Sequence, residues 1–285
     1  MSADGWLSLM EIGIFSRTFA RLTLGEVLDA VCVSGLAQVH FNLKSAGLAS
    51  LPEELTAEHD ATIRGEFEKR GMVMTSISAT FNAIHPDRNQ RERDIRRACQ
   101  IIEHCRAMGT SIVSLCTGTR DPDDMWRRHP DNEGTEAWRD LRATLQKLLQ
   151  TAERCGVILG IEPEKGNVVN SAVRARQLLD EVRSPNLKII MDGANLFDPE
   201  DLPRMQPVLE EAFDLLGADL VMAHAKDITN DPAKIDQAAG TGRLDWHLYC
   251  RLLKQASYQG PVVLHNLCES QVAASVAFLR RHLAL

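Results

Sequence analysis

The chain has 285 residues, of which 44% are hydrophobic and 25% are charged, and its 32 basic and 39 acidic side chains give a formal net charge of −7. This composition is typical of a globular protein, no apolar run reaches the roughly 20 residues that cross a bilayer, and Met1–Gly5 does not begin a secretory signal. Because nonspecific nucleic-acid binding needs clustered Lys and Arg, we expect a cytoplasmic protein with no nucleic-acid partner and no membrane partner.

The seven cysteines are odd in number and form no C-x-x-C motif. This usage favours free thiols in a reducing compartment over a disulfide framework. Cys116 and Cys268 could act as nucleophiles, but a small buried side chain is the simpler interpretation of each.

Eight short apolar runs are expected to form β-strands, and six of them follow a Gly or Pro within three residues, as a helix stop before a strand requires. In chain order the runs are Met10–Phe15, Ala37–Phe41, Met72–Ser78, Ser111–Cys116, Val157–Glu162, Leu187–Asp192, Asp219–His224 and Pro261–His265. Stretches with apolar residues at i, i+3 and i+4 lie between some of these runs. They predict helices over Asp94–Met108, Thr135–Cys155, Ala172–Val182 and Ser270–His282.

Strands that alternate with helices imply parallel pairing. Eight such units in 285 residues match a single (β/α)8 TIM barrel, and we expect one domain over residues 1–285. A doubly wound open sheet is the alternative, but the first strand is followed by Ser16-Arg17-Thr18-Phe19 and not by G-x-G-x-x-G. The two longest irregular stretches, Thr117–Glu133 and Asp227–Leu244, follow strands and are expected on the catalytic face.

Polar residues at the carboxyl ends of barrel strands are expected to meet on one face. Glu162, Asp192 and His224 end three consecutive predicted strands, and His265 ends the next one. Carboxylates together with imidazoles suit Mn²⁺, Mg²⁺, Co²⁺ or Zn²⁺, so these four residues predict a metal site. Each residue alone could instead be a helix cap, a loop ion pair or a structural histidine, but their coincidence in barrel order favours the metal.

Several short motifs occur in order along nearly the whole chain. They are Ser78-Ala79-Thr80-Phe81-Asn82 with His85-Pro86-Asp87, Cys116-Thr117-Gly118-Thr119-Arg120-Asp121, Glu162-Pro163-Glu164, Asp192-Gly193-Ala194-Asn195, His224-Ala225-Lys226-Asp227 and Gly240-Thr241-Gly242-Arg243-Leu244-Asp245-Trp246. Each motif is weak by itself. Together the sequence resembles the xylose-isomerase-like TIM barrels, a family that includes sugar phosphate isomerases and epimerases.

The resemblance implies one divalent metal ion, held by a Glu after strand five, an Asp or His after strand six, a His after strand seven and a Glu after strand eight. Glu162, Asp192 and His224 match the first three positions. The fourth position is His265 where the family has Glu, and this departure argues against a symmetric mechanism with two carboxylates.

The resemblance further implies a sugar or sugar phosphate isomerase or epimerase that transfers a proton through a metal-stabilised enediolate. Glu162 is then expected to be ligand and base, and His265 to be a ligand or the second acid–base group. The expected substrate-binding residues are His40, Asn82, Glu164, Asn195 and Lys226. A surface ion pair with Asp227 is an equal alternative for Lys226, and Glu269 is expected to cap the last helix.

Two other functions remain open. A metal-dependent lyase or dehydratase acting on a keto-sugar or keto-inositol would use the same enolate stabilisation and expel a β-hydroxyl group. A non-catalytic sugar-binding barrel would result if the presence of His265, where the family has Glu, has abolished catalysis. AP endonucleases of the endonuclease IV type share the barrel, but the zinc ligands and basic groove that they need are not evident. We expect a small polyhydroxylated carbonyl compound as the partner, and a homo-oligomer stays open.

Overall fold

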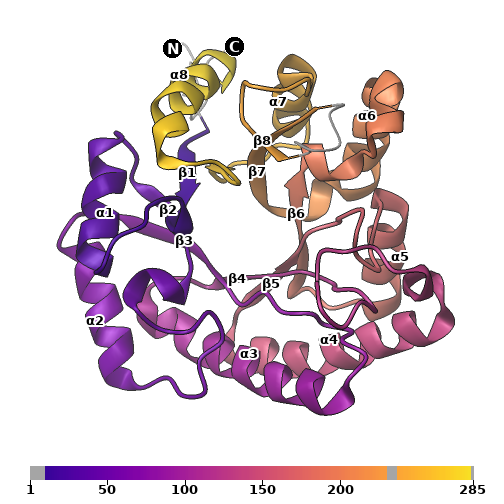
Figure 1. Ribbon diagram of the computed structural model, residues 1–285, viewed down its shortest axis with the longest axis horizontal. Coiled ribbons are helices and arrows are strands. Elements are labelled where there is room, and N and C mark those ends of the chain that lie inside the picture. The colour runs from indigo at the N-terminus through magenta and orange to yellow at the C-terminus, as the bar shows by residue number, and fades with distance from the viewer. Residues whose placement is uncertain (1–9, 230–235, 284–285) are drawn as a thin grey trace, which may run out of the picture.

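Eight parallel strands form a closed barrel with helices around its outside in the computed structural model, which describes residues 10–229 and 236–283 (Figure 1). The barrel closes because β1 pairs with both β2 and β9, and β7 pairs with both β6 and β9. The strands are β1 (Ile12–Phe15), β2 (Gln38–Phe41), β3 (Val73–Ser78), β4 (Ile112–Leu115), β5 (Ile158–Ile161), β6 (Leu187–Asp192), β7 (Leu220–Ile228) and β9 (Val262–Leu264). The predicted (β/α)8 barrel is therefore confirmed.

The second long loop is more regular than the sequence indicated. β7 continues to Ile228, four residues beyond the predicted end, and pairs antiparallel with the short strand β8 (Asp236–Ala238). The predicted irregular stretch Asp227–Leu244 is thus wrong in this part, because it contains a β-hairpin arm. Residues 230–235 of that stretch, like Met1–Gly5, lie outside the described residues.

The four predicted helices are present. They are α3 (Arg88–Met108), α4 (Thr135–Cys155), α5 (Ala172–Val182) and α8 (Val272–Leu283). α3 begins six residues before the predicted start, because the Asp87 side chain accepts hydrogen bonds from the backbone N–H groups of Asn89 and Gln90 and so caps the helix there. The remaining helices are α1 (Leu24–Val33), α2 (Ala57–Glu68), α6 (Met205–Leu216) and α7 (Trp246–Gln255).

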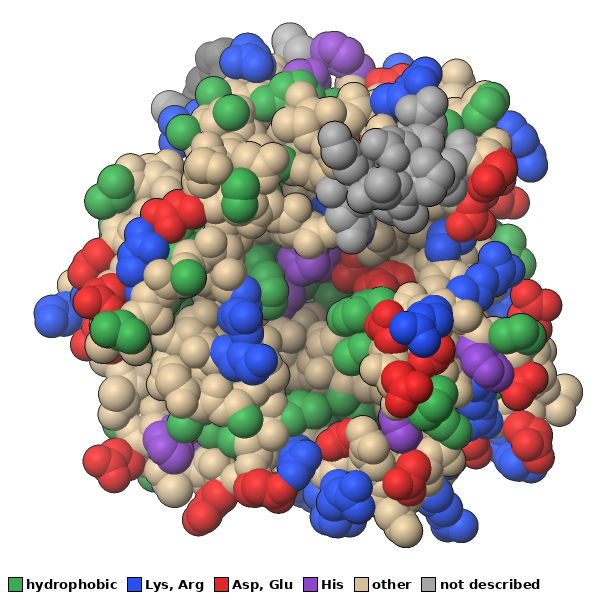
Figure 2. Space-filling model, viewed as in Figure 1, with side chains coloured by type: hydrophobic (Ala, Val, Ile, Leu, Met, Phe, Trp, Pro, Cys, Tyr) green, Lys and Arg blue, Asp and Glu red, His purple; other side chains and the backbone are tan. Residues whose placement is uncertain are grey.

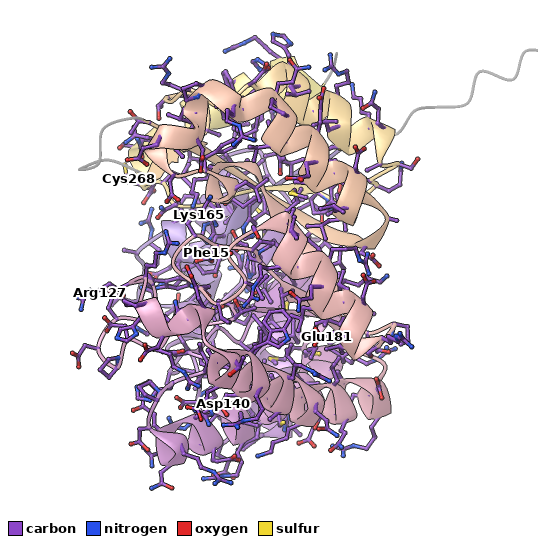
Figure 3. The ribbon with its side chains drawn as sticks, turned by 90° about the vertical axis from the view of Figure 1, so that its right-hand side faces the viewer. Phe15, Arg127, Asp140, Lys165, Glu181 and Cys268 are labelled. Atoms are coloured by element: carbon purple, nitrogen blue, oxygen red, sulfur yellow. The ribbon has the colours of Figure 1, made fainter. Side chains whose placement is uncertain are left out.

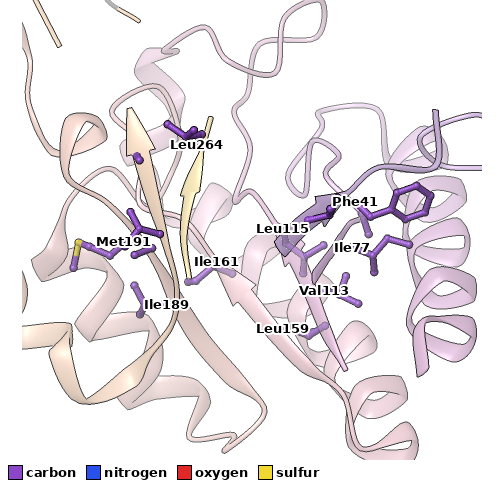
Figure 4. Close-up of a cluster of buried hydrophobic side chains, with 14 of the residues drawn as sticks. Phe41, Ile77, Val113, Leu115, Leu159, Ile161, Ile189, Met191 and Leu264 are labelled. Atoms are coloured by element: carbon purple, nitrogen blue, oxygen red, sulfur yellow. The ribbon is translucent and has the colours of Figure 1, made fainter. Parts of the chain in front are cut away.

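The main core lies between the outer surface of the barrel and the helices. Side chains along a strand alternate between its two faces, so every second residue points outward. Ile77, Val113, Leu159 and Ile189 are fully buried in this layer (Figure 4). The apolar strands are buried on both faces, which accounts for their nearly continuous hydrophobic runs.

A second, smaller apolar cluster fills the inside of the barrel. Ile190, Met222 and Val263 pack together there, and we call them the apolar floor. Gly160 in β5 makes room for the floor, since a Cβ atom at this position would lie 2.8 Å from Cγ1 of Ile190. The floor therefore closes the barrel below the carboxyl ends of β5, β6, β7 and β9.

Cys116 is buried as expected, whereas Cys268 is exposed, so the expectation of a buried side chain at Cys268 is wrong. All seven cysteines are free, as predicted. Across the described residues, none of the helices combines the length and the apolar character needed to cross a membrane.

Candidate metal centre

Three residues that could bind a metal lie directly above the apolar floor. Asp192, His224 and His265 each follow a residue of the apolar floor by two positions. Residues two positions apart in a strand lie on the same face, so all three side chains point into the barrel, as the floor residues do. β6 and β7 are in register with Asp192 opposite His224. One ligand atom from each of the three residues lies within 4.8 Å of the others. Figure 2 shows histidine and acidic side chains inside a hollow at the centre of this face.

Four of the polar atoms of this cluster are buried and make no hydrogen bond. Oδ2 of Asp192, both ring nitrogens of His224 and Nδ1 of His265 make no hydrogen bond. Buried polar atoms normally have partners, and leaving one without a partner costs about 1–3 kcal/mol. Oxygen and imidazole donors at this spacing fit a divalent cation, which would satisfy them together.

Glu162 follows β5 and stands beside this cluster. Its Oε2 lies 3.3 Å from Nδ1 of His224, and its Oε1 accepts a 2.6 Å hydrogen bond from Nδ2 of Asn195. Lys226 donates a hydrogen bond to Oδ1 of Asn195, and its Nζ lies 3.7 Å from Oδ2 of Asp192. Lys226 is buried and points into the cluster, so the alternative of a surface ion pair between Lys226 and Asp227 is wrong.

The two histidines of the cluster, His224 and His265, are part of a stack of rings. The His224 and His265 rings are parallel with centroids 4.6 Å apart, and His40 stacks on His224 at 5.7 Å. Phe15 lies 4.8 Å from His40 and 5.1 Å from His265. Nε2 of His40 is 3.0 Å from the hydroxyl of Ser114, which fixes the His40 ring against the wall of the barrel.

The protonation states of these rings differ because their neighbours differ. Burial and the nearby His224 lower the pKa of His265 to about 3, and burial holds the pKa of His40 well below its usual value. Burial also lowers the pKa of His224, but the carboxylates of Glu162 and Asp192 outweigh it, so this pKa is raised. His265 and His40 are therefore neutral near pH 7, and a neutral imidazole is the form that binds metals.

Two predicted substrate-binding residues lie in the loops around the hollow. The side-chain oxygen of Asn82 accepts hydrogen bonds from the backbone N–H groups of Thr119 and Ile84, and its Nδ2 donates to the carbonyl of Asp121. These bonds hold two loops together, and substrate binding by Asn82 stays a prediction. Glu164 is half-buried, and its backbone forms a turn with Asn167 and Val169.

The buried carboxylate of Asp227, which was expected only as a possible ion-pair partner of Lys226, holds the arm after β7. Oδ1 of Asp227 accepts from the backbone N–H groups of Ile228 and Leu244, and Oδ2 accepts from Gly240 N–H and from Nε1 of Trp246. Trp246 is buried in the core. Asp227 thus fixes the arm next to Lys226.

A tyrosine from the outer helices reaches the same strands. Tyr249 of α7 is fully buried, and its hydroxyl lies 2.9 Å from the carbonyl oxygen of Met191 and 3.1 Å from that of His224. Burial and the nearby Asp192 carboxylate raise the pKa of Tyr249 well above its usual value, so the hydroxyl remains a donor. No helix was predicted over this segment, so Tyr249 was not expected beside the cluster.

A recess of about 410 Å³ opens beside His265, between the ends of β1 and β9. Its wall includes Phe15, Arg17, Thr18, Asn266, Cys268 and Gln271. Figure 3 shows Cys268, Lys165 and Arg127 along the face that carries the hollow, seen there from the side. Glu269 stands in the turn before α8, but its carboxylate accepts hydrogen bonds of 2.6 and 2.9 Å from Arg21, and the N-cap residue of this turn is Cys268, so the expected cap by Glu269 is wrong.

Comparisons with known proteins agree with this arrangement. A sequence model described as the xylose isomerase-like TIM barrel matches residues 39–282. The chain is 29% identical over 137 residues to D-psicose 3-epimerase of Enterocloster bolteae, and the match spans 47% of this chain and 41% of the epimerase. The chain thus covers less than half the length of this curated relative.

Solved structures share the fold over nearly the whole chain. The 3-keto-D-glucoside 4-epimerase from E. coli is 20% identical, with a TM-score of 0.73 over 95% of this chain and 99% of the epimerase. A D-tagatose 3-epimerase-like protein is 14% identical, with a TM-score of 0.74 over 96% and 97% of the two chains. The IOLI protein, solved with a bound zinc atom, is 16% identical, with a TM-score of 0.70 over 96% and 98%.

Proposed function

The chain belongs to the xylose isomerase-like TIM barrel family, and on this basis we propose that it is a single-domain, divalent-metal-dependent isomerase or epimerase of a sugar or sugar phosphate. One observation carries the proposal: ligand atoms of Asp192, His224 and His265 converge within 4.8 Å of one another beside the carboxylate of Glu162, and four of their buried polar atoms make no hydrogen bond. The epimerase activities named for its relatives support a polyhydroxylated carbonyl substrate.

The proposed mechanism is a proton transfer at the carbon next to the substrate carbonyl. A divalent ion held by Asp192, His224 and His265, with Glu162 as a further ligand, supplies Lewis-acid polarisation of that carbonyl. Glu162 takes the proton, because its carboxylate lies at the edge of the cluster and is only 8% exposed. The Glu162 carboxylic acid formed in this step then returns the proton, which balances the reaction, and the neutral His265, whose ring is parallel to that of His224, serves as a ligand.

Polar side chains around the cluster hold the substrate hydroxyl groups. The Asn195 amide bridges Glu162 and Lys226, so it orients the base and presents Lys226 to the substrate. His40 and Glu164 line the remaining sides in this proposal. The recess beside His265 accommodates the part of the sugar that extends away from the ion, with Arg17 at its wall.

Product analysis in heavy water tests the proposed reaction. Mn²⁺-loaded protein is incubated in D₂O with D-fructose, D-psicose or a 3-keto-glucoside, and the products are separated and weighed by mass spectrometry. We expect an isomer of one substrate that has exchanged hydrogen for deuterium and is otherwise unchanged in mass. Loss of water would instead identify a lyase or dehydratase. Binding of a sugar without exchange or turnover would identify a non-catalytic barrel.

Replacing His265 by alanine is expected to weaken Mn²⁺ binding about 10-fold or more, because one nitrogen ligand is removed. Isothermal titration of metal-free protein with Mn²⁺ measures the change. His247→Ala, on the exposed side of α7, is the matched control and should bind as the parent protein does. An unchanged dissociation constant in His265→Ala would place His265 outside the coordination shell.

A further inference from the structure

Tyr249 connects the two strands that carry neighbouring ligands of the candidate metal centre. Its hydroxyl is shared between the carbonyl oxygens of Met191 on β6 and His224 on β7. The Met191 carbonyl belongs to the peptide group that leads into Asp192, and the His224 carbonyl belongs to a candidate ligand itself. A single hydroxyl thus contacts the backbone next to both side chains.

The packing around Tyr249 leaves its ring little freedom. Phe213 and Trp246 meet the ring edge to face, with centroids 5.9 and 5.8 Å away. Gly193, directly after Asp192, lets the ring approach the strand end, since a Cβ atom there would lie 3.1 Å from two ring carbons. The hydroxyl position is therefore determined by the packing of α6 and α7 against the barrel.

We propose that Tyr249 is a positioning residue, which sets the separation of Asp192 and His224 for metal binding by joining the carbonyl groups beside them. This inference rests on the proposed function, because it assumes that the two side chains bind a metal. Partners that orient the ligands of a metal commonly change its affinity by about 10–100-fold when they are removed.

Tyr258 provides a matched control at the opposite side of β7. Its ring is also buried, and its hydroxyl accepts from Ala223 N–H at 3.0 Å and donates to the carbonyl of Pro261 at 2.7 Å. It therefore joins β7 to β9 much as Tyr249 joins β6 to β7. The peptide groups that Tyr249 contacts are bonded directly to the Cα atom of a candidate ligand. Those that Tyr258 contacts lie at least one residue further along the chain from any candidate ligand.

The test compares Tyr249→Phe with Tyr258→Phe. Both variants lose a buried hydroxyl and keep the ring, so both are expected to melt at a lower temperature than the parent protein. Titration of metal-free protein with Mn²⁺ alone separates them. We expect the dissociation constant to rise about 10-fold in Tyr249→Phe and to stay within about twofold of the parent value in Tyr258→Phe.

Each outcome decides between the two proposals. If the parent protein binds no Mn²⁺ or Zn²⁺, the metal-dependent function and the inference both fail. If the parent protein binds metal and Tyr249→Phe binds it equally well, or if both variants lose affinity equally, the inference alone is overturned.

Gly193→Ala gives a second measurement if Tyr249→Phe does not fold. This variant retains the hydroxyl but places a methyl group against the ring. Weaker Mn²⁺ binding is expected, and unchanged affinity overturns the inference.

Discussion

Replacing Glu162 by glutamine is expected to lower the turnover of the metal-loaded enzyme about 10²–10⁴-fold, which is the usual contribution of a general base. Glutamine has nearly the same shape, and its amide oxygen can still accept the hydrogen bond from Nδ2 of Asn195. The glutamine amide, unlike the carboxylate that it replaces, cannot take a proton from the substrate. The rate of deuterium exchange into the substrate measures the loss directly, with circular dichroism as the check that the barrel is intact.

Glu269→Gln is the control for this experiment. Glu269 is exposed and pairs with Arg21 at the surface, so loss of its charge should leave turnover unchanged. Equal exchange rates in Glu162→Gln and the parent protein would show that another group removes the proton, and Glu164 would then be the next carboxylate to replace.

Replacing Asp227 by asparagine is expected to destabilise the protein by about 2–6 kcal/mol. The buried carboxylate accepts four hydrogen bonds, two on each oxygen. Asparagine turns one oxygen into a donor, so two buried N–H groups lose their acceptor, at about 1–3 kcal/mol each. Urea denaturation measures the free energy of unfolding, and a lower midpoint with an unchanged slope is expected.

Asp245→Asn is the matched control, because it makes the same chemical change in the same segment. Oδ1 of Asp245 caps α7 by accepting from Leu248 N–H, and asparagine caps a helix about as well as aspartate. The control should change stability by less than about 0.5 kcal/mol. Similar stabilities of the two variants would mean that the arm after β7 is not held by Asp227.

The strands were predictable because a parallel barrel buries them on both faces, and the resulting apolar runs mark them along the sequence. Helices with a continuous apolar stripe, such as Thr135–Cys155, were predictable for the same physical reason. The helix Ala57–Glu68 was not predicted, because only Ile63 and Phe67 give it a large buried apolar surface and Gly65 interrupts it. Tertiary packing and the cap at Thr56 stabilise it instead.

Much of the candidate site was also predictable, since polar residues at strand ends converge in any barrel. The sequence could therefore place Asp192, His224 and His265 on one face. It could not show that the imidazole rings of His224 and His265 stack, or that the Asn82 side chain forms hydrogen bonds that join two loops. Such contacts depend on side-chain directions and loop paths, which periodicity does not encode.

The apolar floor of Ile190, Met222 and Val263 has a kinetic consequence. In the proposed function, the floor fills the barrel beneath the ligand cluster, so an ion, a sugar and a product would all pass through the same mouth. A sugar seated over the cluster would then obstruct the exit of the ion. We therefore expect an ordered association, with the ion first and the sugar second, and a longer residence time of the ion as the sugar approaches saturation.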